Sequence, residues 1–338
     1  MAVGKTEEVR GLKALAKLAG VSPATVSRVI NDRPGVRPEL RQAVEQAIRE
    51  HGLNLDVAAR ALKSRKTQRL AIITPRAGNL VFANPFFTEI LRGITSVTEQ
   101  RGYTLAVTTA ATSQTLYEVN RNRSCDGVLF IGFRKSVPEP RSLKGATVPV
   151  VTIPRPGPQY KLPYVTMEDE AGAYEATSHL IQRGHRRIAL LNGPRTSIYS
   201  INRLSGYRKA LAEAGLAFDP SLVTDGDFDH DGAYRATLQL LDMDKPPTAI
   251  FATSDFMATG ATCGVQSRGL SIPRDIALVG FGNTAICTHI TPMLTSVDEQ
   301  LQELGVQAAT LLVRLAEGET VETTQIALPT KLVVRESS

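Results

Sequence analysis

Residues 12–31 read LKALAKLAGVSPATVSRVIN, and this stretch decides how the front of the chain folds. Apolar residues recur at helical spacing from Leu12 to Ala19. Gly20 can adopt the left-handed conformation that ends a helix, and Ser22 is suited to cap the next one. The stretch therefore predicts a helix, a tight turn and a second helix.

The second helix has two different faces. Its apolar residues Val26, Val29 and Ile30 can pack on the first helix. The opposite face carries small or hydrogen-bonding side chains, namely Pro23, Ala24, Thr25, Ser27 and Arg28. Such a helix fits the major groove of DNA, because Arg28 can pair with two acceptors on one guanine edge. An ordinary helical hairpin would have the same spacing.

The run AGVSPATVSRVIN at residues 19–31 resembles the DNA-binding head of the lactose-repressor/galactose-repressor (LacI/GalR) family of bacterial transcription regulators. The signature of that family includes A-G-V-S-x-x-T-V-S-R-x-x-N, and the resemblance continues to about residue 336. It implies that the residues that contact DNA in the head are Ser22, Pro23, Ala24, Thr25, Ser27, Arg28 and Asn31.

A third amphipathic helix, within residues 37–52, completes a small all-α head that we assign to residues 1–52. Residues 53–69 follow as a hinge helix and linker. In the family, a hinge leucine wedges into the minor groove of the operator and bends it. The AARAL pattern assigns this role to Leu62, with Ala58 and Ala59 against the groove.

The hinge departs from the family pattern just before this leucine. The family usually has Tyr-x-Pro-Asn, whereas this chain has the residues LNLD at 53–56. Without the proline, the sequence does not establish that the hinge orders in the family's way.

The basic charge of the chain is concentrated at its front. Residues 1–69 contain 14 Lys and Arg against 7 Asp and Glu, a net charge of +7. Since the whole chain carries +6, the remaining 269 residues carry about −1. Such an excess favours a polyanionic partner and salt-sensitive binding, although a solvated basic surface would have the same composition.

From Leu70 onward, buried strands alternate with amphipathic helices. This rhythm predicts parallel sheets covered on both faces. Two such sets predict a core of two doubly wound α/β lobes, similar to periplasmic binding proteins, over residues 70–336. The first lobe covers about 70–165 plus 298–324, and the second about 166–297 plus 325–336.

Two details of this core also follow from the resemblance. The helix at 299–317 and the strand near 325–335 should cross back between the lobes. The segment TSQTLYEVNRNRSC, residues 112–125, is shorter than the helix that relatives have there, so we expect one wall of the cleft to be abbreviated.

A ligand of such a core binds in the crevice at the carboxyl ends of the strands. Position against the family pattern gives the candidate contacts Phe86, Phe87, Ser197, Tyr199, Arg203, Phe228, Ser254, Asp255, Gly282 and Asn283. Arg203 falls where the family has an arginine that reaches the ligand. An ion pair between the lobes is the alternative for Arg203, and core packing is the alternative for the phenylalanines.

Three carboxylates that are common in the family are missing. Pro154, Met167 and the GFGN segment at 280–283 stand where relatives have aspartate. Because Arg203 is retained and Arg155 lies nearby, we expect an anionic effector, a sugar acid or sugar phosphate rather than a neutral hexose. GFGN also resembles gluconate-type members of the family. A regulator without any small effector is the alternative.

Other classes of protein are disfavoured. No apolar stretch is long enough to span a membrane, and the first ten residues, MAVGKTEEVR, lack an apolar signal core, so we expect a cytoplasmic protein. The three cysteines and five histidines have no metal-type spacing, and we expect neither a cofactor nor a metal. No strand is followed by a nucleophile elbow, a P-loop or a dinucleotide-binding glycine motif, so we expect no enzyme.

The sequence therefore predicts a DNA-binding transcription regulator, a repressor of carbohydrate or sugar-acid genes. Because one recognition helix reads only a few base pairs, we expect a homodimer on a palindromic operator, with a small effector that modulates its affinity. The alternatives are a two-lobed small-molecule receptor and an effector-independent regulator.

Overall fold

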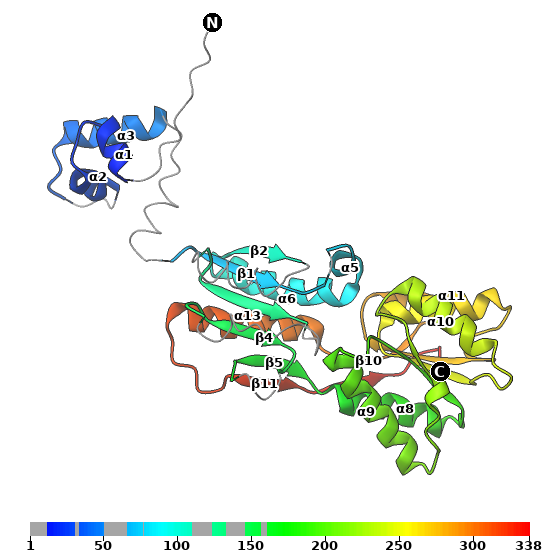
Figure 1. Ribbon diagram of the computed structural model, residues 1–338. Helices are drawn as coiled ribbons and strands as arrows, with labels where there is room; N and C mark the ends of the chain where they lie inside the picture. Colours follow the sequence, from blue (N-terminus) through cyan, green and yellow to red (C-terminus); the bar gives the residue numbers. More distant parts are fainter. Residues whose placement is uncertain are drawn as a thin grey trace, which may run out of the picture. The chain divides into compact units, whose positions relative to one another are not determined.

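The computed structural model describes residues 12–30, 34–50, 66–76, 78–109, 124–132, 146–156 and 161–338 (Figure 1). The chain separates into two compact units, Met1–Gln68 and Arg69–Ser338. No helix in the described part is long and apolar enough to span a bilayer.

The described part of the first unit contains three helices, α1 (Leu12–Leu18), α2 (Pro23–Ile30) and α3 (Pro38–Glu50). Gly20 adopts a left-handed conformation with φ +64°, as expected for the turn between α1 and α2. The helices enclose a small core, whose buried members are Leu15, Ala16, Val26, Val29, Val44 and Ala47. The predicted helix-turn-helix head is therefore present.

The second unit contains two six-stranded sheets, each with a lobe built around it. The strands of the first lobe are β1 (Arg69–Ile73), β2 (Thr104–Thr108), β3 (Gly127–Ile131), β4 (Val150–Ile153), β5 (Tyr164–Met167) and β11 (Gln325–Leu328). Those of the second lobe are β6 (Ile188–Asn192), β7 (Val223–Asp225), β8 (Ala249–Ala252), β9 (Ala277–Gly282), β10 (Thr295–Asp298) and β12 (Lys331–Val333).

Both sheets have the open order of doubly wound folds. The first runs β11-β5-β4-β3-β1-β2 and the second β12-β10-β9-β8-β6-β7. Among the described strands, every pairing is parallel except that of β12 with β10. This confirms the predicted α/β core of two parallel-sheet lobes.

Helices cover the sheets in the way the buried strands require. In the first lobe these are α5 (Gly78–Ala83), α6 (Pro85–Gln100) and α13 (Leu301–Glu317). In the second they are α8 (Asp169–Gln182), α9 (Ile198–Glu213), α10 (His230–Leu241), α11 (Asp255–Ser267) and α12 (Ile286–His289). In Figure 1, α8 lies beside α9 and α10 beside α11.

Strand β6 shows why both faces must be covered. Ile188 and Leu190 belong to the apolar cluster that includes α8 and α9, whereas Ala189 and Leu191 belong to the cluster that includes α10 and α11. Because successive side chains of a strand point to opposite faces, a continuous apolar run needs helices on each side.

The crossing at the end of the chain differs from the prediction. We expected residues 325–336 in the second lobe, but β11 pairs with β5 in the first sheet, and only β12 joins the second. The chain thus crosses between residues 328 and 331. Pro329 separates the two strands, because a residue without an N–H group interrupts a strand ladder.

Other predicted features fall outside the described residues. They include Asn31, the hinge residues Ala58, Ala59 and Leu62, and most of the abbreviated segment at 112–125.

The helices α6 and α13 pack backbone to backbone. A Cβ atom on Gly93 would lie 2.0 Å from the carbonyl oxygen of Gln302, and one on Gly305 would lie 2.2 Å from that of Ile90. Since neither carbonyl can move without displacing its helix, only glycine permits this approach.

We therefore expect Gly93→Ala to lower the free energy of unfolding by about 1–3 kcal/mol, because the added methyl group separates α6 from α13. Glu99→Ala, at an exposed position of the same helix, should change it by less than about 0.5 kcal/mol. Urea unfolding followed by circular dichroism measures both, and equal stabilities of the two variants would contradict the packing argument.

Candidate functional site

The outer face of α2 has the properties expected of a recognition helix. The side chains of Val26 and Val29 are buried in the core of the first unit, while those of Pro23, Ala24 and Arg28 are exposed.

Ser22 begins the helix by accepting a hydrogen bond from the backbone N–H of Thr25 at 3.1 Å. Ser22 is exposed, while Thr25 and Ser27 are partly exposed. Six of the DNA-contact candidates are thus near or on one accessible helix, and Asn31 and the hinge candidates lie outside the described residues.

A cavity of about 700 Å³, including its open mouth, lies in the second unit. It lies where strands of both sheets end: Arg76 and Gly132 follow β1 and β3 of the first lobe, while Ser254 and Glu299 follow β8 and β10 of the second. This is where open parallel sheets bind their ligands.

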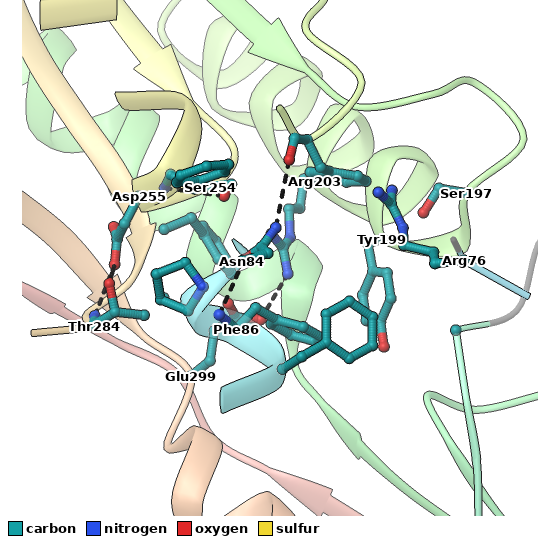
Figure 2. Close-up of a pocket in the computed structure, with 17 residues that line it drawn as sticks. Arg76, Asn84, Phe86, Ser197, Tyr199, Arg203, Ser254, Asp255, Thr284 and Glu299 are labelled. Atoms are coloured by element: carbon teal, nitrogen blue, oxygen red, sulfur yellow. Dashed lines mark hydrogen bonds and ion pairs between the residues drawn. The ribbon is translucent and has the colours of Figure 1, made fainter. Parts of the chain in front are cut away.

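Most of the predicted ligand contacts line this cavity (Figure 2). They are Phe86, Phe87, Ser197, Tyr199, Arg203, Phe228, Ser254, Asp255 and Gly282. Asn283 does not line it, although both of its chain neighbours do. The Oδ1 atom of Asn283 instead accepts a hydrogen bond from Arg335 Nη2 at 2.6 Å, so the structure does not bring this side chain into the lining.

Sequence reasoning also missed part of the lining. The additional residues are Arg76, Asn84, Pro85, Gly132, Phe256, Phe281, Thr284 and Glu299. Arg76, Gly132 and Glu299 each follow a strand, and this position could have identified them. Arg155 lies outside the lining, and its guanidinium stacks on the ring of Tyr164.

Arg203 of α9 is buried and bonded in three directions. Its Nε donates to Asp169 Oδ1 at 2.7 Å, and its Nη2 donates to Glu299 Oε1 at 2.6 Å. Its Nη1 donates to the carbonyl oxygen of Thr253 at 2.5 Å, and its guanidinium lies 3.9 Å from the ring centroid of Phe281.

The sequence left two roles open for Arg203, a ligand contact and an ion pair between the lobes, and the position of the side chain is compatible with both. The side chain lines the cavity, and it also forms ion pairs with residues at the boundary between the lobes.

Asp255 is a second buried carboxylate in the lining, held within the second lobe. Its Oδ2 accepts bonds from the backbone N–H of Thr284 at 2.7 Å and from the Thr284 hydroxyl at 3.0 Å. Its Oδ1 accepts a bond from the Ser296 hydroxyl at 2.5 Å. These bonds fix the start of α11 against the end of β9.

Aromatic and amide groups meet across the cleft. The ring of Phe86, from the first lobe, lies edge-on to that of Tyr199, from the second, with centroids 5.7 Å apart. Asn84 Nδ2 donates to the carbonyl oxygen of Phe228 at 3.4 Å, and the Arg76 guanidinium lies 5.3 Å from the Phe228 ring centroid. The two lobes therefore contact each other directly at the cavity.

Phe228 has an uncommon backbone conformation, with φ +54°. A bulky residue rarely adopts the left-handed region, and such residues concentrate at functional sites. Its ring packs so closely on Gly193 that a Cβ atom there would lie 2.2 Å from it. The chain thus holds this ring in one fixed place.

Tyr199 carries a hydroxyl that has no hydrogen-bond partner among the described residues, although the group is buried in the lining. Burial and the nearby Asp169 and Glu299 carboxylates raise the pKa of Tyr199 well above its usual value, so the hydroxyl keeps its proton. An unpartnered buried hydroxyl is costly unless a ligand or water completes it.

Several buried carboxyl groups lie near the guanidinium of Arg203. Burial raises the pKa of Glu299 to about 8; Arg203 opposes this, and the Asp169 and Asp255 carboxylates add to it. Burial likewise raises the pKa of Asp255, against the hydrogen bonds from Ser296 and Thr284. One guanidinium cannot compensate several buried carboxylates, so protonation lowers the charge of the site.

Two family profiles match the chain. The profile described as "Bacterial regulatory proteins, lacI family" matches residues 11–54. The profile described as "Periplasmic binding protein-like domain" matches residues 177–338. The first covers the three-helix unit, and the second covers most of the second lobe.

Similar proteins extend over the whole chain. The HTH-type transcriptional regulator CelR of Thermobifida fusca is 37% identical over 331 residues, which are 96% of this chain and 97% of CelR. The solved CelR–cellobiose complex has a TM-score of 0.76 at 35% identity and covers 97% of this chain and 100% of its own. The lac repressor dimer, bound to operator and the anti-inducer ONPF, has a TM-score of 0.76 at 25% identity and covers 97% and 98%.

The raised pKa of Glu299 gives a testable pH dependence. Between about pH 4.5 and about 8, the folded chain keeps a proton on Glu299 that the unfolded chain releases. This contribution to stability is lost as the pH rises through that window. Glu299→Gln mimics the protonated group, so its free energy of unfolding should exceed that of the wild type by at least about 1 kcal/mol at pH 9, with little difference at pH 5.

Chemical denaturation at a series of pH values measures this difference. The same stability difference between Glu299→Gln and the wild type at pH 5 and pH 9 would contradict the assignment.

Proposed function

The chain belongs to the lacI family of bacterial DNA-binding transcription regulators, and we propose that it is a repressor of carbohydrate genes whose operator affinity responds to a saccharide in the interlobe cleft. The observation that carries this proposal is the cavity, which is lined from both lobes at the ends of their strands. A ligand that touches both lobes binds one arrangement of them better than another. Occupancy of the cavity can therefore change the arrangement of the lobes and, through it, the affinity for the operator.

The DNA-binding half of the proposal assigns base recognition to α2. Its exposed residues include Arg28, and residues 1–69 carry a net charge of +7, against about −1 for the rest of the chain. Because one such helix reads few base pairs, we propose a homodimer on a near-palindromic operator. The lac repressor, a structural neighbour, is a dimer on its operator. The protein would then act in the cytoplasm, where the chromosome is.

We further propose that Leu62, with Ala58 and Ala59, enters the minor groove at the centre of the operator. The support is the AARAL pattern alone, in a stretch of four basic residues between 60 and 66. An apolar wedge unstacks a base step, and the resulting bend increases the contact between protein and DNA.

The cavity offers the two kinds of group that hold a saccharide. Rings such as Phe86 and Phe228 can cover the apolar face of a sugar, and carboxylates such as Glu299 and Asp255 can accept hydrogen bonds from its hydroxyls. The unpartnered hydroxyl of Tyr199 can bond to a ligand oxygen. These groups favour a polyhydroxylated ring compound.

The geometry favours a neutral saccharide over the sugar acid expected from the sequence. That expectation depended on three missing carboxylates and on two arginines. The guanidinium of Arg203 already contacts Asp169 and Glu299, and Arg155 lies outside the lining. A ligand carboxylate would have to compete with them and would approach Asp255 as well. CelR is a relative whose structure contains a neutral disaccharide, cellobiose.

A panel of ligands separates these two possibilities. Isothermal titration calorimetry with cellobiose, glucose, gluconate and glucose 6-phosphate should show a neutral sugar binding at least about tenfold tighter than either anion, since a buried unpaired charge is costly. Tighter binding of gluconate or glucose 6-phosphate than of both neutral sugars would restore the anionic ligand.

Replacing Arg28 tests the role of α2. Selection from a pool of random duplexes gives the preferred site, and fluorescence anisotropy then measures its affinity and that of single-base variants. We expect Arg28→Ala to lose about 1–3 kcal/mol of discrimination at one G·C pair, because a bidentate guanine contact is removed.

Arg49→Ala is the matched control, because Arg49 is an exposed arginine at the end of α3. It should change affinity for all sequences alike. An Arg28→Ala variant that weakens every duplex equally would make Arg28 a phosphate contact and contradict its role in base reading.

A further inference from the structure

Three short segments connect the two lobes, and they are bonded to one another. Glu168 links β5 to α8, residues 299–300 link β10 to α13, and residues 329–330 link β11 to β12. The hydroxyl of Thr330 donates to the carbonyl oxygen of Glu168 at 3.2 Å, and Gln300 Nε2 donates to that of Pro329 at 2.7 Å. These bonds join the first and the second connection to the third.

Glu299 belongs both to these connections and to the cavity. It is the first residue of the second connection, it lines the cavity, and only 1% of its surface is exposed. Its Oε1 accepts the hydrogen bond from Arg203 Nη2. Through Arg203 Nε it is linked to Asp169, which directly follows the first connection.

We propose that Glu299 is the positioning residue through which a ligand in the cavity acts on the connections between the lobes. A ligand hydroxyl that bonds to Glu299 competes with Arg203 for the same carboxyl group. This competition weakens the bond between Arg203 of α9 and the second connection. Arg203 keeps its bond to Asp169, which directly follows the first connection. This inference rests on the proposed function, because it describes how occupancy of that cavity alters the lobes.

Asp255 shows why this role is specific to Glu299. Both carboxyl groups are buried in the same lining, but the partners of Asp255 are Thr284 and Ser296, within the second lobe. Among the described residues, these hydrogen bonds of Asp255 do not reach a connection between the lobes. Of the carboxyl groups that line the cavity, Glu299 is the one that also lies in a connection.

Glu299→Met tests the proposal and leaves Arg203 with an acidic partner. Methionine has a similar length and no carboxyl group, and Arg203 keeps its partner Asp169, so the variant retains a paired cation. Glu303→Met is the control. Glu303 is an exposed residue in the first turn of α13, and it bonds only to Gln307 among the contacts described.

The first measurement needs no ligand. Hydrogen–deuterium exchange reports the backbone N–H of Glu168, which donates to the carbonyl oxygen of Leu328 at 3.0 Å. Among the described residues, no hydrogen bond or ion pair joins Glu168 directly to Glu299, so a defect confined to residue 299 would leave this bond unchanged. We expect Glu299→Met to speed exchange at least about threefold in peptides covering both 164–169 and 298–302, and Glu303→Met to leave the first peptide unchanged.

The second measurement separates binding from coupling. With cellobiose as the probe, the wild type should show a change in the Kd for its selected duplex of about fivefold or more. Glu299→Met should reduce this change to less than about twofold, even where cellobiose still saturates the variant, and Glu303→Met should retain it.

The outcomes are distinguishable. If peptide 164–169 exchanges at the wild-type rate in Glu299→Met, or if this variant keeps the full change in duplex Kd, the proposal for Glu299 is overturned and the proposed function stands. If no member of the sugar panel binds or alters duplex binding by the wild type, the proposed function fails and this inference fails with it.

Discussion

The two-lobed core depends on one buried guanidinium. Arg203 joins α9 to Asp169, to Glu299 and to the end of β8, and these groups belong to elements far apart in the sequence. Removal of this guanidinium would leave the buried Asp169 without its cation, and such a loss typically costs about 3–5 kcal/mol. The same side chain lines the cavity, so the bonds that join α9 to a connection between the lobes lie where a ligand would bind.

Much of the fold could be predicted because it depends on local periodicity. The two faces of α2, the left-handed Gly20 and the buried run of β6 follow from spacing and conformational preference. The place of β11 could not be predicted in this way. Its sequence, QIAL, is compatible with either sheet, and its pairing with β5 is a contact across more than 150 residues. The sheet that β11 joins is determined by tertiary pairing, which a short sequence pattern does not encode.

The candidate site was predictable where a strand end or a family pattern marks it, as for Tyr199, Arg203 and Asp255. It was not predictable where an uncommon backbone conformation directs a side chain away from the cavity. Asn283 has φ +48° and bonds to Arg335, while Gly282 and Thr284 on either side line the cavity. Glu299 was missed because the strand TSVD before it is short. The bonds of Arg203 to Asp169 and Glu299 were missed as well, because they join residues far apart in the sequence.

Linkage gives the most direct test of whether the cavity controls DNA binding. If a saccharide changes the Kd for the selected duplex by some factor, the duplex must change the Kd for that saccharide by the same factor. The decisive measurement is therefore the Kd for cellobiose, by titration calorimetry, with and without saturating duplex. The account predicts two different values whose ratio equals that found for the duplex Kd with and without cellobiose, and equal values would contradict it.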